Sequence, residues 1–153
     1  MNYKIFEKPD FYFAGISCRT ENADGKAGQD IYNLWDRLFK EDISRKISNK
    51  ISDDTYTVYT DYESDHNGEY TAIVGFPVTY TKEAPKGIEL FKIKGGKYAE
   101  IIARGELPDC VLEAWEDIYN SDLDRRYGAD FDIYPDDNLD PLNTKVKIYV
   151  SIK

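Results

Sequence analysis

The sequence predicts an α+β domain made of a duplicated β-α-β-β unit, with an antiparallel sheet, two helices on one face of the sheet and a central groove between the halves. Two helical stretches predict this fold, because apolar side chains recur in each of them every three or four residues. The two stripes match at a constant offset of 80 residues: Ile31, Leu34, Trp35, Leu38 and Phe39, and Val111, Ala114, Trp115, Ile118 and Tyr119. A helix with one apolar face packs on another layer, so both helices are expected to cover a sheet.

The chain length and the repeat together indicate a single domain. A chain of 153 residues forms one domain, or two small halves that share one core. We therefore expect one domain of two pseudo-repeats, at about residues 11–78 and 87–152. In that case residues 11–78 superpose on residues 97–152, and the superposition places Trp35 on Trp115.

The first repeat begins after a short polar lead, residues 1–10. Alternating aromatic, β-branched and polar residues predict its strands, which cover residues 11–17, 55–63 and 70–78. An Asn67-Gly68 pair between the last two strands is typical of a hairpin turn. The first helix is expected to begin near Asp30 and to run into the 40s, where residues 42–44 bend or break it.

The second repeat has the same order of elements. Its strands are expected at residues 87–94, 98–103, 130–134 and 146–152. Gly95 and Gly96 form a tight turn between the first two of these strands, because glycine takes positive φ without steric cost. Gly105 and Pro108 end the next strand and open the second helix, since proline is tolerated in the first helical turn. Residues 135–143 form an acidic loop.

Composition argues against several classes of partner. The formal net charge is −9, whereas nucleic-acid binding needs a basic surface, so no direct nucleic-acid contact is expected. No apolar run resembles a signal peptide or approaches the length of a membrane span, which indicates a cytoplasmic protein without a membrane partner. Cys18 and Cys110 are the only cysteines, and two free thiols fit a reducing compartment.

Metal sites and cofactors are not expected either. His66 is the only histidine and is expected to be exposed beside the Asn-Gly turn, which excludes the usual triads and histidine-rich metal sites. Four residues of one loop, Asp136, Asp137, Asn138 and Asp140, lack the spacing of an EF-hand. The sequence contains no phosphate-binding loop and no dinucleotide fingerprint.

The candidate site is built around Asp132. On its expected strand Asp132 alternates with Phe131 and Ile133, so it shares a face with Asp130 and Tyr134. If that face lines the groove, the carboxylate can pair with a cation in a site of low dielectric, where attraction is stronger than in water. The alternative is a solvated carboxylate on a strand.

Aromatic residues form the second part of the candidate site. Tyr59 and Tyr149 lie on expected strands of opposite halves, and Trp35 and Trp115 occupy matched positions on the two helices. Such rings form a cage for a protonated or quaternary amine, at about 0.5–2 kcal/mol for each desolvated cation–π contact. The alternative is packing, because tyrosines pair across strands and a tryptophan on an apolar stripe is usually core. The remaining candidates are Tyr32, Tyr119 and Tyr134.

A set of motifs in fixed order resembles the GyrI-like, or AraC-type, effector-binding domain family. The motifs are YTDYESDHNGEYTAIVGFPV, FKIKGGKYAEIIARG, a Trp-bearing helix, FDIY and a final IYVSI, and they cover nearly the whole chain from Phe11. The resemblance implies a duplicated β-α-β-β fold with a central ligand groove for small molecules that are often cationic, aromatic and amphipathic. Many members of the family are the sensing halves of transcription regulators. Some bind drugs alone, including proteins carried on integron cassettes, and others resemble hydrolases of strained rings.

The chain departs from the family pattern in two ways. It contains no helix-turn-helix segment, so any DNA-binding module is expected on another protein. The groove acid of the family is usually a glutamate in an F-E-x-Y strand, but here Asp132 occupies that place. Aspartate is shorter by one methylene, which sets its carboxylate back by about 1.5 Å. The shorter side chain weighs against chemistry that needs the reach of glutamate.

These observations favour a stand-alone binding protein for cationic or amphipathic small molecules, related to the sensing domains of multidrug-responsive transcription regulators. It is expected to act as a sensor, as a sequestering protein or as the partner of a separately encoded regulator. One alternative is a hydrolase that uses the groove acid to activate water or to attack a ring carbon. A third reading is an interaction module whose groove takes a protein segment.

Overall fold

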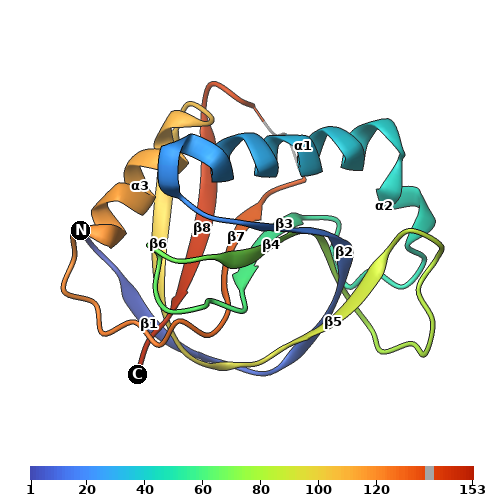
Figure 1. Ribbon diagram of the computed structural model, residues 1–153, viewed down its shortest axis with the longest axis horizontal. Helices are drawn as coiled ribbons and strands as arrows, with labels where there is room; N and C mark the ends of the chain where they lie inside the picture. Colours follow the sequence, from blue (N-terminus) through green and yellow to red (C-terminus); the bar gives the residue numbers. More distant parts are fainter. Residues whose placement is uncertain (137–139) are drawn as a thin grey trace.

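In the part of the chain that the structure describes, one antiparallel sheet of eight strands forms the fold, in the order β1-β6-β8-β7-β3-β4-β2-β5 (Figure 1). The computed structural model describes residues 1–136 and 140–153, so Asp137 and Asn138 of the expected acidic loop lie outside the described residues. The strands are β1 (Lys4–Lys8), β2 (Phe11–Thr20), β3 (Thr55–Thr60), β4 (Tyr70–Val78), β5 (Glu89–Ile93), β6 (Gly96–Gly105), β7 (Asp130–Tyr134) and β8 (Thr144–Ser151).

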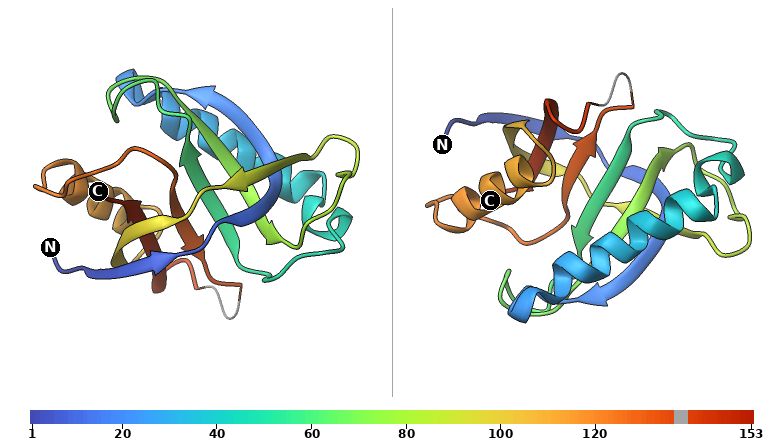
Figure 2. Two further views of the ribbon diagram at one scale, coloured as in Figure 1. Left: turned by 90° about the horizontal axis from the view of Figure 1, so that it is seen from below. Right: turned by 90° about the horizontal axis from the view of Figure 1, so that it is seen from above.

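Two longer helices, α1 (Lys26–Lys40) and α3 (Asp109–Tyr119), lie on the same face of the sheet (Figures 1 and 2). A 3₁₀ turn (Ala23–Gly25) precedes α1, which begins earlier than the expected Asp30. The expected break near residues 42–44 is present, because Asp42 has a positive φ of 50° and separates α1 from the short α2 (Ile43–Lys46). None of the helices in the described residues is both long enough and apolar enough to cross a membrane.

The two halves of the sheet repeat one strand order around the central β3–β7 pair. Outward from β3 the order is β4 and then β2, and outward from β7 it is β8 and then β6. The outermost strands are exchanged between the halves, since β5 pairs with β2 and β1 pairs with β6. This arrangement confirms the predicted α+β fold, with an antiparallel sheet and helices on one face.

The prediction of a polar lead before residue 11 is wrong for β1. This strand pairs with β6 in the register Lys4↔Glu100 to Lys8↔Gly96. Four of its five side chains are exposed, so the buried–exposed alternation that reveals a strand is absent from its sequence. Backbone pairing at the edge of the sheet forms β1, and side-chain pattern alone does not predict such pairing.

Both faces of the sheet are apolar, which the sequence pattern does not show. Beneath α1 one cluster includes Leu34, Leu38 and Val74, and beneath α3 a second includes Ile118 and Ile148. The third cluster lies on the opposite face and contains Phe13, Val58, Ile73, Ile93, Tyr98, Ala129, Phe131 and Tyr149. The sheet curls so that its edge strands pass below the central ones (Figure 1), which encloses this third cluster.

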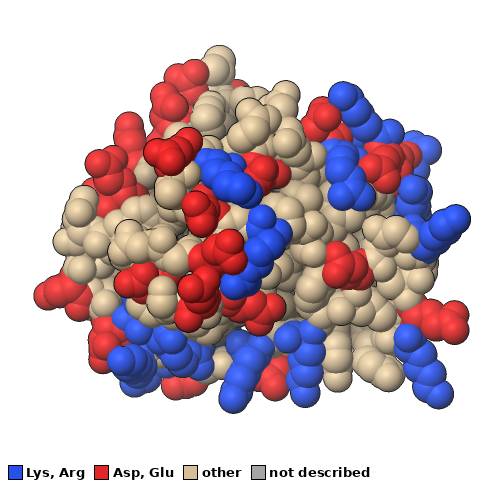
Figure 3. Space-filling model, in the orientation of Figure 1, with Lys and Arg blue, Asp and Glu red and all other residues tan. Residues whose placement is uncertain are grey.

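Charge is unevenly distributed over the two helices. The sequence of α3 contains four acidic residues and no basic residue, whereas α1 contains both signs. In α1, Lys26 pairs with Asp30 and Lys40 pairs with Asp36. Acidic side chains gather over the end of the molecule that holds α3 (Figure 3).

Strands β2 and β4 approach each other closely where Gly15 faces Gly75. A Cβ atom on Gly75 would lie 2.1 Å from the backbone oxygen of Ala14, and one on Gly15 would lie 2.3 Å from that of Val74. Because neighbouring backbone occupies this space, no rotamer change can make room for a side chain. The glycine pair therefore permits the curl of the sheet beneath α1.

Gly75→Ala should lower the free energy of unfolding by about 1–3 kcal/mol, the cost of forcing extra volume into a packed interior. Gly28→Ala is the matched control, because Gly28 lies in α1 and a Cβ there meets nothing within 4 Å. The free energy of unfolding of that control should rise by about 0.5–1 kcal/mol, because alanine has a higher helix propensity than glycine. Urea unfolding of both variants measures the two changes, and equal stability of Gly75→Ala and the unmodified chain would refute the close approach.

Candidate ligand-binding site

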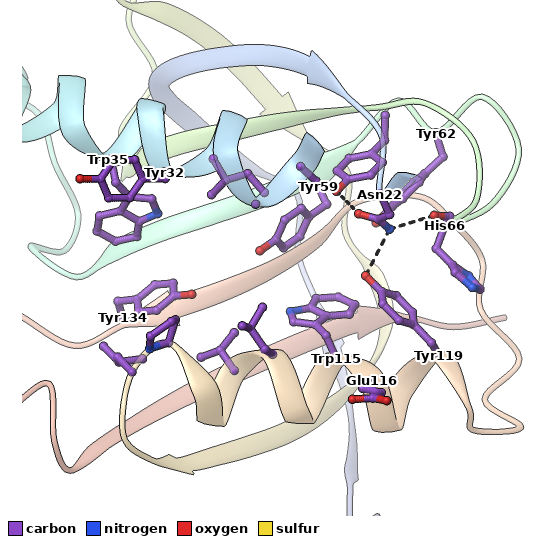
Figure 4. A pocket seen from close by; sticks show the side chains of 18 of the residues that line it. Asn22, Tyr32, Trp35, Tyr59, Tyr62, His66, Trp115, Glu116, Tyr119 and Tyr134 are labelled. Atoms are coloured by element: carbon purple, nitrogen blue, oxygen red, sulfur yellow. Dashed lines mark hydrogen bonds between the residues drawn. The ribbon is translucent and has the colours of Figure 1, made fainter. Parts of the chain in front are cut away.

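A cavity of about 770 Å³ lies between α1 and α3, over the strands at the centre of the sheet (Figure 4). Each helix buries one apolar stripe on the sheet and presents the edge of that stripe to the cavity. From α1 the lining residues are Ala27, Gly28, Ile31, Tyr32, Trp35 and Phe39, and from α3 they are Val111, Leu112, Trp115, Glu116 and Tyr119. The strands contribute Tyr59, Tyr70 and Tyr134.

Two edge-to-face aromatic pairs join the halves across the cavity. The rings of Trp35 on α1 and Tyr134 on β7 lie 5.0 Å apart, with an angle of 79° between their planes. The rings of Trp115 on α3 and Tyr59 on β3 lie 5.3 Å apart at 77°. Each pair combines a helix of one half with a strand of the other. The edge-to-face arrangement is one that aromatic quadrupoles favour, and it fixes the rings that line the cavity.

A polar cluster lies at one end of the cavity. Asn22 donates hydrogen bonds to the backbone oxygen of His66 at 2.8 Å and to the Tyr119 hydroxyl at 3.4 Å (Figure 4). The His66 ring stacks on Tyr119 with 4.6 Å between centroids. Burial, and then the positive charge of Arg125, lower the pKa of His66, which favours the neutral form of its ring. The loop after β3 thus reaches across to α3.

The Asp132 carboxyl lies directly behind two of the lining side chains. The Tyr59 hydroxyl donates a hydrogen bond of 2.6 Å to Oδ2, and Nε1 of Trp115 donates one of 3.0 Å to Oδ1. Asp132 is 0% exposed. Burial raises the pKa of Asp132 to about 7, although hydrogen bonds from Tyr59 and Trp115 oppose the rise. At neutral pH the carboxyl therefore carries only part of a negative charge.

A second buried carboxylate, Asp130, lies two residues before Asp132 on the same strand face. It forms an ion pair of 2.8 Å with Arg125 and accepts a hydrogen bond of 2.6 Å from the Tyr62 hydroxyl. The backbone N–H and the hydroxyl of Ser151 donate to its other oxygen. Asp130 is therefore fully engaged, and Arg125 presents its side chain to the cavity from this anchored position.

The structure brings six of the eight predicted site residues to the cavity: Tyr32, Trp35, Tyr59, Trp115, Tyr119 and Tyr134. Asp132 is on the expected strand face, but Tyr59 and Trp115 separate it from the cavity. The structure does not bring Tyr149 there. Tyr149 does point away from Ile148 and Val150, yet those two residues face α3, so Tyr149 lies on the opposite face of the sheet. The sequence interpretation assumed a sheet with a single apolar face, whereas apolar clusters lie on both.

Other cavity-lining residues were not singled out from the sequence. Asn22, Tyr62, His66 and Arg125 lie in loops, where no periodicity indicates which way a side chain points. The expectation that His66 is exposed is wrong, because its ring is half-buried against Tyr119. Among the described residues, no group of three or more His, Cys, Asp and Glu side chains is placed to hold a metal ion.

Asp132→Asn should remove a pH dependence of stability. The folded-state pKa of Asp132 is raised from 3.8 to about 7. The stabilising contribution of the protonated carboxyl is therefore complete below pH 3.8 and is lost as the pH rises through about 7. Since one pKa unit corresponds to about 1.4 kcal/mol, the unmodified chain should lose about 2–3 kcal/mol relative to Asp132→Asn between about pH 5 and 8.

Urea unfolding of both proteins across this pH range measures the difference, and comparing them cancels the titration of groups other than Asp132. A stability difference that is the same at both ends of the range would mean that the buried carboxyl does not titrate there.

Comparisons with known proteins give the same fold. A protein of Bacillus subtilis strain 168 named "Putative transcriptional regulator protein YobU" is 35% identical over 146 residues, covering 92% of this chain and 91% of that protein. The integron cassette protein VCH_CASS2 from the mobile metagenome of Vibrio cholerae is 27% identical, with a TM-score of 0.77 over 99% of this chain and 95% of its own.

SAV2435, solved bound to tetraphenylphosphonium, is 19% identical and shares the fold, with a TM-score of 0.82 over 100% of this chain and 94% of its own. The family described as GyrI-like small molecule binding domain matches residues 1–153. Because this match spans the whole chain and the YobU relative is similar over nearly all of it, the chain belongs to the GyrI-like family of small-molecule-binding domains.

Proposed function

We propose that the cavity binds cationic or amphipathic small molecules that carry aromatic rings. The observation that supports this most directly is a layer of aromatic side chains, Trp35, Tyr59, Trp115 and Tyr134, with a buried carboxyl behind it. Aromatic faces are electronegative and attract a cation, and each ring offers a large contact area to an apolar body. The cavity thus combines apolar contact with aromatic rings and a partly ionised carboxyl, and Arg125, the one Lys or Arg side chain among the described lining residues, is paired with Asp130.

Asp132 contributes to the attraction of a cation without touching the ligand. Tyr59 and Trp115 orient their polar O–H and N–H bonds toward its carboxyl. Their rings pack edge to face, and Arg125 lies 5.7 Å from the centroid of the Trp115 ring, so the ligand would meet only the parts of these rings that line the cavity. In a site of low dielectric the carboxylate acts on a cation over a longer distance than it would in water. A bound cation in turn favours the ionised form of Asp132, which lowers its pKa.

Comparison with relatives supports both the ligand class and the biological role. SAV2435, which has the same fold, was solved with tetraphenylphosphonium, a delocalised aromatic cation. The name of YobU points to transcription regulation. We propose that this protein is an effector-binding protein of the cytoplasm. It would sense or sequester its ligand and act through a separately encoded regulator, without direct nucleic-acid contact.

The hydrolase alternative requires a carboxyl in contact with its substrate. The Asp132 carboxyl is covered by Tyr59 and Trp115, so neither water nor a ring carbon in the cavity lies against it. Its raised pKa alone does not make it a general acid, because proton transfer needs hydrogen-bond reach. For this reason we favour binding over turnover.

The unmodified protein should bind tetraphenylphosphonium at least about tenfold more tightly than tetraphenylborate, an anion of the same shape and nearly the same size. A tenfold difference corresponds to about 1.4 kcal/mol, which is within the range of one or two desolvated cation–π contacts. Quenching of Trp35 and Trp115 fluorescence, or calorimetry, gives both dissociation constants. Equal affinities, or a preference for the anion, would exclude the cationic ligand class and leave the fold untouched.

A further inference from the structure

Glu116 is a carboxylate at the mouth of the cavity. It lines the cavity from α3 and is exposed, in contrast to Asp132 behind the aromatic layer. Figure 4 shows it on α3 beside Tyr119, which is itself 38% exposed. Among the described residues that line the cavity, Glu116 is the one Asp or Glu side chain. Its carboxylate lies over α3, outside the layer of rings, and so belongs to the rim of the cavity (Figure 4).

In the described part of the chain, Arg125 is the one Lys or Arg side chain that lines the cavity with Glu116, and it is paired with Asp130. Among the residues that the structure describes, Glu116 itself forms neither an ion pair nor a side-chain hydrogen bond, and α3 contains no Lys or Arg. Across the cavity α1 is different, because Lys26 and Lys40 are already paired with acids of the same helix. The acidic surface over α3 adds to the local negative potential (Figure 3).

We propose that Glu116 forms a second cation site, which holds the ammonium head of an amphiphilic ligand at the cavity mouth while its aromatic body lies between Trp35 and Trp115. This proposal rests on the proposed function. It states where the positive charge lies when the ligand is an amphiphile with a terminal ammonium group. A cation with its charge at the molecular centre, such as tetraphenylphosphonium, is held among the rings and does not need Glu116. A ligand with a terminal amine carries its charge to the mouth.

Tyr119 completes this site. It follows Glu116 by three residues, so the two side chains are neighbours on one face of α3. Its hydroxyl accepts a hydrogen bond from Asn22 and its ring stacks on His66, which together hold the ring in place. Tyr119, with His66 stacked on it and Trp115 at 5.9 Å between ring centroids, therefore forms a fixed wall beside Glu116.

The test compares three ligands: 4-phenylbutyltrimethylammonium, its uncharged analogue with a tert-butyl group in place of trimethylammonium, and tetraphenylphosphonium. Glu116→Gln should weaken binding of the first about two- to fivefold, which is the effect expected of an exposed ion pair. The same variant should leave the dissociation constant of the uncharged analogue unchanged, and it should weaken binding of tetraphenylphosphonium less than binding of the ammonium probe, because the phosphonium charge is farther from the mouth. Raising the ionic strength from about 0.05 to 0.5 M should reduce the effect of Glu116→Gln, because salt screens exposed charges.

Glu113→Gln is the matched control. Glu113 is exposed on the same helix and does not line the cavity, so the variant changes the net charge equally without changing the mouth. The inference is wrong if Glu116→Gln leaves ammonium binding unchanged, if Glu113→Gln weakens it equally, or if the unmodified protein does not bind the ammonium probe. A preference for tetraphenylphosphonium over tetraphenylborate that persists in any of these cases would leave the proposed function standing.

Discussion

Two carboxylates buried side by side on β7 determine how the halves of the molecule meet. Asp130 and Asp132 are each 0% exposed, and a buried carboxyl is costly unless donors surround it. Tyr59 and Tyr62 supply donors from the first half, and Trp115, Arg125 and Ser151 supply them from the second. The need to satisfy both carboxyls therefore fixes α3, the segment after α3 and the strands around the central β3–β7 pair relative to one another.

The same donors form the wall of the cavity, which connects the stability of the fold to ligand binding. Tyr59 and Trp115 direct their polar groups backward to Asp132 and their rings forward to the cavity. A ligand that pushed either ring aside would leave a buried carboxyl without its donor, at a cost of about 1–3 kcal/mol. Ligands are thus expected to rest on the aromatic layer, where Asp132 contributes through its field.

Sequence periodicity predicted the parts of the structure in which one face of an element is buried. The bounds of β4 and β7 match the expected residues 70–78 and 130–134. The helical stripes placed Trp35 and Trp115 on one cavity because both helices pack on the same face. Alternation also placed Asp132 on the correct face of β7, but it contains no information about what covers that face.

Features that depend on long-range contact were not predictable in this way. The exposed side chains of β1 give no alternation, and Tyr149 is buried in a cluster on the second face of the sheet that strands from both halves enclose. His66 and Arg125 reach the cavity from loops whose course depends on tertiary contacts. Each of these features depends on contact with residues that are distant in the sequence.

Proton release on binding tests the central claim, that Asp132 acts electrostatically through the aromatic layer. Calorimetric titration of tetraphenylphosphonium at pH 7, in buffers of different ionisation enthalpy, counts the protons released. With a pKa of about 7 in the free protein, Asp132 should release up to about half a proton as the bound cation lowers that pKa. Asp132→Asn should bind the cation with no release. Binding to the unmodified protein without proton release would contradict the account, because the carboxyl behind Tyr59 and Trp115 would then be indifferent to the charge in the cavity.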